Sequence, residues 1–118
     1  SVEMTEYMRR TKELTEEWRS LWKNTKINGL HIYESHSNFK LAKILTPDLT
    51  AEQITDKLLR NYHILIRNAA SFPYLDERYI RFCMRLPQEN KLLALALEEF
   101  LISKKLVQKT SKKIRKFS

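Results

Sequence analysis

Two arginines, Arg67 and Arg81, lie on either side of a short loop in the stretch ILIRNAASFPYLDERYIRF, residues 64–82. Arg67 ends one apolar segment and Arg81 lies within the next, so a hairpin would bring both guanidinium groups to one edge of a sheet. Each guanidinium can donate two parallel, charge-assisted hydrogen bonds to a phosphate or a carboxylate. The alternative is that nearby carboxylates neutralise the arginines as ordinary surface pairs. These carboxylates belong to Asp76, Glu77 and Glu89.

Other kinds of catalytic or metal-binding motif are missing from the sequence. His31, His36 and His63 have no ligand-like spacing and no cysteine or cluster of acids beside them, so we expect no metal site. Gly29 is the only glycine, which leaves no glycine-rich loop to hold a nucleotide phosphate. Cys83 is the only cysteine, which excludes an internal disulfide and a cysteine-rich zinc site.

An amphipathic helix is predicted for the first part of the chain. Its apolar stripe includes Trp18 and Trp22, and the helix ends before the turn at Asn28-Gly29. Paired aromatic residues can form a ligand platform, but on such a stripe they are more often core or a patch that faces a partner. The residues at three- and four-residue steps are Met4, Tyr7, Met8, Thr11, Leu14, Thr15, Trp18, Leu21 and Trp22.

Extended segments and a second helix follow this turn. LHIYES and SNFKLAKIL, residues 30–35 and 37–45, have the composition of strands. Thr50 and Gln53 then have the spacing of a capping box, which predicts a helix that begins after Thr50. The apolar residues of this helix are Ile54, Leu58 and Leu59.

The second half of the chain predicts two more strands and a last helix. HILIR, residues 63–67, is apolar on both faces and is predicted to be a central strand. In residues 79–86 the side chains alternate, with Ile80, Phe82, Met84 and Leu86 toward the core. Pro87 suits the first turn of a helix with a core stripe of Leu93, Leu97, Phe100 and Leu101. We therefore expect one α+β domain of order αβαββα, with a small antiparallel-type sheet and helices packed on one face.

The net charge of +8 comes almost entirely from the C-terminal residues. Removing the seven bases of residues 104–118 from the total of 22 leaves 15 to face 14 acids. This tail could bind the phosphates of a nucleic acid, but it is expected to be a solvated, frayed terminus. Its basic residues are Lys104, Lys105, Lys109, Lys112, Lys113, Arg115 and Lys116. With no apolar run of membrane-spanning length and no signal-peptide pattern, we expect a cytoplasmic protein.

The stretch ILIRNAASFPYLDERYIRFCMRLPQENKLLALALEEFL, with SNFKLAKI before it, resembles the C-terminal small domain of fold-type I pyridoxal-phosphate enzymes. The resemblance covers about residues 30–101 and is nearest to the threonine-phosphate decarboxylases and histidinol-phosphate aminotransferases. It rests on an ILIR strand, an aromatic-Pro loop, D-x-R-Y-x-R, and P-x-E-N at the start of the last helix. It implies a small domain over residues 1–103, in which residues 1–27 form the interdomain helix, followed by the basic tail.

The resemblance also implies roles for individual residues. Arg81 would bind the α-carboxylate of the substrate, or the phosphate that replaces it, and Arg67 would assist in members that handle phosphates. Asn38, from the asparagine-phenylalanine strand, would lie near the cleft. Tyr74 departs from the pattern, because the family usually has glycine there, so Tyr74 must take a different turn or fill space.

The catalytic machinery that the family needs is absent from this sequence. The Schiff-base lysine, the aspartate that pairs with the pyridine nitrogen and the residues that hold the cofactor phosphate belong to a large domain, which would precede residue 1. The stretch TSKK, residues 110–113, superficially resembles the Ser-x-x-Lys loop of the family, but it lies in the tail and does not replace that machinery. Pyridoxal phosphate would therefore be held by the missing large domain of an intact enzyme, expected to be a homodimer, and this chain alone would be inactive.

The resemblance implies an enzyme that acts on an O-phospho amino acid. The first expectation is an L-threonine-O-3-phosphate decarboxylase of corrinoid synthesis, and the alternative is an aminotransferase of the histidinol-phosphate type. Two readings of another class stay open: a module that binds nucleic acid through the tail and the sheet face, and a module that binds a protein through the Trp18/Trp22 stripe.

Overall fold

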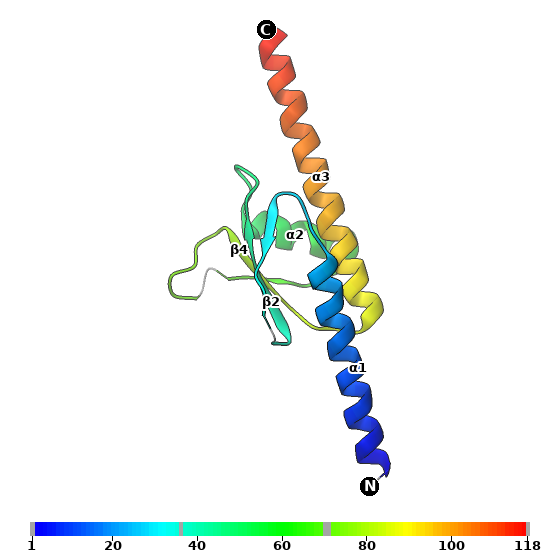
Figure 1. Ribbon diagram of the computed structural model, residues 1–118. Helices are drawn as coiled ribbons and strands as arrows, with labels where there is room; N and C mark the ends of the chain where they lie inside the picture. Colours follow the sequence, from blue (N-terminus) through cyan, green and yellow to red (C-terminus); the bar gives the residue numbers. More distant parts are fainter. Residues whose placement is uncertain (1, 36, 70–71, 118) are drawn as a thin grey trace.

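The computed structural model describes residues 2–35, 37–69 and 72–117, with side chains described as far as Leu106. Within these residues it confirms the α+β class, with three helices and a four-stranded antiparallel sheet (Figure 1). The order is αββαββα, because the two extended segments after the first helix form separate strands. The elements are α1 (Val2–Asn24), β1 (Leu30–Ile32), β2 (Phe39–Ile44), α2 (Ala51–Tyr62), β3 (Arg67–Asn68), β4 (Tyr79–Cys83) and α3 (Pro87–Phe117).

The strands lie in the order β1-β2-β4-β3, and each neighbouring pair is antiparallel. Residues 63–67 were predicted as a central strand, and this was wrong: only Arg67 and Asn68 pair, at the edge of the sheet. Ile64 and Ile66 are buried, whereas Leu65 is 54% exposed. The segment is apolar on both faces in sequence, but Leu65, the middle one of its three apolar side chains, is exposed to solvent.

The helices cover one face of the sheet, and the other face is open. On β4, Ile80 and Phe82 are buried while Arg81 between them is only half-buried. Phe82 meets the rings of Trp18 and Trp22 at centroid distances of 6.2 and 4.7 Å. The tryptophans are therefore part of the core, and Trp18 has no exposed surface. We call the uncovered side, which carries Arg81, the open face.

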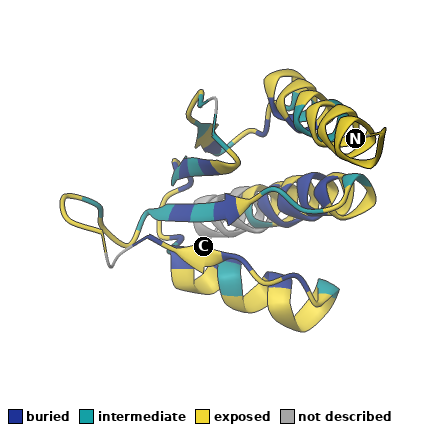
Figure 2. Ribbon diagram, turned by 90° about the horizontal axis from the view of Figure 1, so that it is seen from below, coloured by how far each residue is buried: buried dark blue, intermediate teal, exposed yellow. Residues whose placement is uncertain are grey.

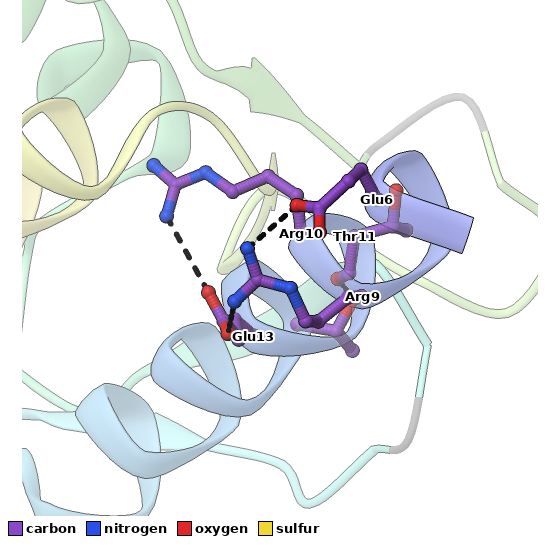
Figure 3. A network of polar contacts seen from close by, with 6 residues as sticks. Glu6, Arg9, Arg10, Thr11 and Glu13 are labelled. Carbon is purple, nitrogen blue, oxygen red and sulfur yellow. Dashed lines mark hydrogen bonds and ion pairs between the residues drawn. The ribbon is translucent and has the colours of Figure 1, made fainter. Parts of the chain in front are cut away.

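The first half of α1 is not covered by the described residues. Met4, Tyr7 and Met8 are each more than half exposed, so the buried stripe expected along the whole helix is confirmed only at its C-terminal end (Figure 2). Arg9 makes ion pairs with Glu6 at 2.7 Å and Glu13 at 2.8 Å, as Figure 3 shows. Solvent screens such exposed pairs, so they support the helix only modestly.

The last helix extends far beyond the expected core stripe. Leu97 and Leu101 are buried as predicted, and Pro87 begins the helix. However, α3 runs through residues 104–117, so the prediction of a frayed tail after the last helix was wrong (Figure 1). This stretch has no proline or glycine and is rich in lysine, which favours a helix. No helix among the described residues meets the length and hydropathy of a membrane span.

Two local interactions fix the ends of these elements. The capping box at Thr50 is confirmed, since its Oγ1 accepts from the Gln53 backbone N–H and the Gln53 Oε1 accepts from the Thr50 N–H. After β4, the buried Asn90 side chain accepts from the Arg85 N–H at 2.9 Å and donates to the Arg85 carbonyl at 3.0 Å. Because β4 ends at Cys83, Leu86 is 53% exposed and was wrongly assigned to the core.

Lys40 is a buried charge on the helix-covered face, and its Nζ donates to the Ser35 carbonyl at 2.9 Å. Burial lowers the pKa of Lys40 below its ordinary value of 10.5, and the nearby Glu34 carboxylate opposes that change. The protonated amine is therefore disfavoured in the folded state. This cost is complete below the folded-state pKa and disappears as pH rises past the ordinary pKa.

Replacing Lys40 with methionine is therefore expected to raise the free energy of unfolding at pH 7 by about 1 kcal/mol. The gain should shrink as the pH rises toward 10.5 and vanish above it, where lysine is neutral in both states. Urea unfolding of both proteins at pH 7, 9 and 10.5 measures this difference. A gain that is the same at every pH would contradict the assigned cause.

Candidate anion-binding site

Arg67 and Arg81 are directly opposite each other in the sheet. They are register partners in the antiparallel pair of β3 and β4. Partners of this kind project from the same face, with Cα atoms about 4.5–5.5 Å apart. The structure thus brings together the two arginines that the sequence predicted to converge. Two like charges in this position destabilise a sheet unless something neutralises them.

The two arginines share an open hollow of about 440 Å³ at the edge of the sheet. Arg67 is exposed and Arg81 is half-buried, so both side chains are accessible to a ligand from solvent. The hollow is lined by Thr55 of α2, Ile66, Arg67, Asn68, Phe72 and Arg81. Among the described residues, the lining contains two cations and no carboxylate, which favours an anion as its occupant.

The alternative that carboxylates neutralise the arginines finds no support in the described residues. Neither Arg67 nor Arg81 makes an ion pair among them, and the ion pairs that do occur involve other arginines. Asp76 instead accepts from the Arg78 backbone N–H at 2.8 Å, within the turn before β4. Glu77 contributes its carbonyl to the Ala51 N–H at the start of α2.

Two aromatic rings next to Arg81 were missed by the sequence analysis. The Cζ of Arg81 lies 5.6 Å from the ring centroid of Phe39 and 5.2 Å from that of Phe72. Both distances are within the range of cation–π interaction. The alternation of β2 could have placed Phe39 on the open face, but Phe72 lies in the loop between β3 and β4, where no periodicity exists.

Asn38 is not brought to the arginines. It precedes β2, its backbone carbonyl accepts from the Met84 N–H at 2.7 Å, and it is not among the residues that line the hollow. Leu41, three residues further on, is the register partner of Arg81. A substrate contact for Asn38 therefore stays a prediction from the resemblance.

Tyr74 takes the turn that a glycine would take. Its φ of 70° lies in the left-handed region and its side chain is fully exposed, so it does not fill space. Left-handed backbone geometry costs a non-glycine residue about 1–2 kcal/mol. Glycine avoids this cost but loses more conformational entropy on folding, which offsets part of the gain.

Replacing Tyr74 with glycine is therefore expected to raise the free energy of unfolding by up to about 1 kcal/mol. Tyr74→Ala removes the ring but retains the strained backbone, so it should give no gain. Urea midpoints of the three proteins test this. An equal gain from alanine would show that the exposed ring, not the backbone, causes the cost.

No group of three or more histidine, cysteine or acidic residues that could hold a metal ion occurs in the described part of the chain. His36, one of the three histidines considered from the sequence, lies outside the described residues.

The chain is similar to several known proteins, among them two curated proteins and one solved structure. The adenosylcobalamin biosynthesis bifunctional protein CobDQ of Leptospira interrogans is 28% identical over 110 residues, which are 92% of this chain and 13% of that protein. The histidinol-phosphate aminotransferase of Methanosphaera stadtmanae is 33% identical over 75 residues, 64% of this chain and 20% of that protein. The crystal structure of L-threonine-O-3-phosphate decarboxylase from Porphyromonas gingivalis gives a TM-score of 0.66 at 30% identity, over 79% of this chain and 27% of that one.

The chain is a partial match to the family of threonine-phosphate decarboxylases and histidinol-phosphate aminotransferases. The match falls in the C-terminal region of these fold-type I enzymes, whose members depend on pyridoxal phosphate. The chain spans between about an eighth and a quarter of the length of the relatives it matches. No protein-family model matches it.

The described residues around the hollow do not include the group that anchors the cofactor of the family. Pyridoxal phosphate needs a lysine for a Schiff base, and no lysine lines the hollow of Arg67 and Arg81 in the described structure. Lys40 lies on the opposite, helix-covered face, where Ser35 holds its amine. Lys43 is on the open face, with its Nζ 5.8 Å from the ring centroid of Tyr79.

Proposed function

We propose that this chain is the substrate-binding small domain of an enzyme that acts on an O-phospho amino acid. Arg81 and Arg67 bind the phosphate or the carboxylate of that substrate together. The observation that carries this proposal is the direct register pairing of the two arginines, without a carboxylate partner among the described residues. An oxyanion placed between the guanidiniums would remove their repulsion and accept parallel hydrogen bonds from both.

The reaction we assign to the whole enzyme is the decarboxylation of L-threonine O-3-phosphate. The likeness to the decarboxylase of Porphyromonas gingivalis and the match of 92% of this chain to a protein of adenosylcobalamin biosynthesis support this choice. A large domain supplies pyridoxal phosphate and its lysine. This chain contributes the orientation of the substrate, because a substrate held by two guanidiniums presents its α-carbon in one fixed geometry.

The activity of the intact enzyme tests this assignment. The enzyme, loaded with pyridoxal phosphate, is incubated with L-threonine O-3-phosphate, and carbon dioxide release is measured. In parallel it is given histidinol phosphate and 2-oxoglutarate, and glutamate formation is measured. We expect carbon dioxide and no glutamate. Glutamate formation without carbon dioxide release would show that the enzyme is an aminotransferase and not a decarboxylase. The proposed role of the two arginines would then still stand.

The size of the protein in its source cells tests whether the chain acts as part of a longer enzyme. An antibody raised against this chain should detect a band several-fold above 14.2 kDa. A band at 14.2 kDa alone would contradict the assignment as an enzyme domain, because the described residues hold no cofactor lysine beside the arginines.

A further inference from the structure

The guanidinium of Arg81 lies between two elements, each of which brings one phenylalanine to it. Phe39 begins β2 and is the register partner of Cys83, two residues along β4 from Arg81. Phe72 comes from the loop that joins β3 to β4, where its backbone N–H donates to the Ala69 carbonyl at 3.0 Å. Ring centroids lie 5.6 and 5.2 Å from the Arg81 Cζ.

We propose that Phe39 and Phe72 are positioning residues that hold the Arg81 guanidinium ready to bind the anion it shares with Arg67. This inference rests on the proposed function of the two arginines. Rings at these distances would restrict the rotamers of Arg81, and both Arg81 and Phe72 line the hollow.

Preorganisation matters because an arginine side chain loses much of its rotamer freedom when it binds a ligand. A guanidinium that is already held loses less on binding, so more of the hydrogen-bond energy is available as affinity. Arg67 shows the contrast: it is exposed and has no ring contact in the described structure. Arg81 is thus the organised member of the pair and Arg67 the adaptable one.

The two rings also have little to do with the stability of the core. Phe39 and Phe72 are each 42% exposed, and neither belongs to the cluster of buried apolar residues. Their contact with the Arg81 guanidinium gives these partly exposed rings a role that packing in the core does not. Their replacement should therefore alter anion binding without unfolding the chain.

The test measures the dissociation constant of inorganic phosphate for the chain by NMR titration of the arginine Nε–Hε signals. Leucine replaces the ring by an aliphatic side chain in Phe39→Leu and Phe72→Leu, and tyrosine retains the ring in Phe39→Tyr and Phe72→Tyr. We expect each leucine variant to bind phosphate about threefold to fivefold more weakly. The tyrosine variants should stay within about twofold of the wild type.

A second readout separates positioning from a general effect on the fold. The ring currents of Phe39 and Phe72 should shift the Arg81 Nε–Hε signal, and this shift should be lost in the leucine variants and kept in the tyrosine variants. Urea midpoints close to that of the wild type verify that each variant is folded.

Arg81→Met distinguishes failure of this inference from failure of the proposed function. If Arg81→Met abolishes phosphate binding while the leucine variants bind as tightly as the wild type, the positioning role is wrong and the anion site remains. Equal weakening by leucine and tyrosine also overturns the positioning role, because the ring is then irrelevant. If Arg81→Met binds phosphate like the wild type, the anion site itself is wrong.

Discussion

Replacing Arg81 with methionine in the intact enzyme is expected to lower kcat/KM for L-threonine O-3-phosphate by about 10²–10³-fold, equivalent to about 3–4 kcal/mol. Arg81 is the half-buried member of the pair, and its Cζ lies 5.6 and 5.2 Å from the ring centroids of Phe39 and Phe72. Its hydrogen bonds to a substrate anion would be charge-assisted. Arg67→Met should cost less, about tenfold, because Arg67 is exposed and less organised.

Arg60→Met is the matched control for these two changes. Arg60 is an exposed arginine of α2 that pairs with Asp56 at 3.1 Å, and it does not line the hollow. Its loss removes one positive charge from the same domain without touching the proposed site. In steady-state kinetics of the three variants, kcat/KM of Arg60→Met should equal that of the wild type. A comparable loss of kcat/KM in all three variants would show that the activity depends on the net charge of the domain and not on the proposed site.

Replacing Trp18 with alanine is expected to lower the free energy of unfolding by about 3–5 kcal/mol. Trp18 has no exposed surface, and its ring lies edge-on to Trp22 and Phe82 at centroid distances of 5.7 and 6.2 Å. Its removal would open a large void where α1 meets the sheet. Domains are stable by only about 5–15 kcal/mol, so this loss would bring the chain close to unfolding.

Tyr7→Ala on the same helix provides the comparison. Tyr7 is 69% exposed, so its loss should change the free energy of unfolding by less than about 0.5 kcal/mol. Urea unfolding, followed by circular dichroism because the first variant removes a tryptophan, measures both effects. Similar small effects from the two variants would mean that α1 is not anchored by Trp18, and the packing described for the sheet would be wrong.

Local signals with a physical cause predicted much of the fold. The capping box of Thr50 and Gln53 fixed the start of α2, and Pro87 fixed the start of α3. The alternation around Arg81 correctly separated Ile80 and Phe82 from the open face. These features depend on neighbouring residues alone, so a pattern in the sequence is enough to find them.

The errors arose where packing between distant segments decides the structure. Whether residues 63–67 form a central strand depends on whether another strand pairs beyond β3. Among the described residues none does, so this apolar segment lies at the sheet edge and Leu65 is exposed. The end of α3 was placed too early because a basic composition indicates solvation but does not stop a helix. Met4 and Tyr7 have helical spacing, but spacing does not reveal whether another element covers them.

In the candidate site too, local patterns predicted some features, and packing between distant segments decided the others. A hairpin between two arginines was predictable, and the structure places Arg67 and Arg81 in register. The contact of Phe72 was not predictable, because its loop has no period. Arg78 was also missed: it donates to the carbonyls of Leu49 and Thr46 at 3.0 and 2.8 Å and ties β4 to the loop before α2. No pattern of spacing distinguishes that structural arginine from Arg81.

The most direct test of the account is a crystal structure of the intact enzyme with L-threonine O-3-phosphate bound. The account predicts that oxygens of one anionic group of the substrate, phosphate or carboxylate, lie within about 3 Å of guanidinium nitrogens of both Arg67 and Arg81. A substrate bound elsewhere, with Arg67 and Arg81 paired to carboxylates of the protein such as Asp76 or Glu77, would contradict it.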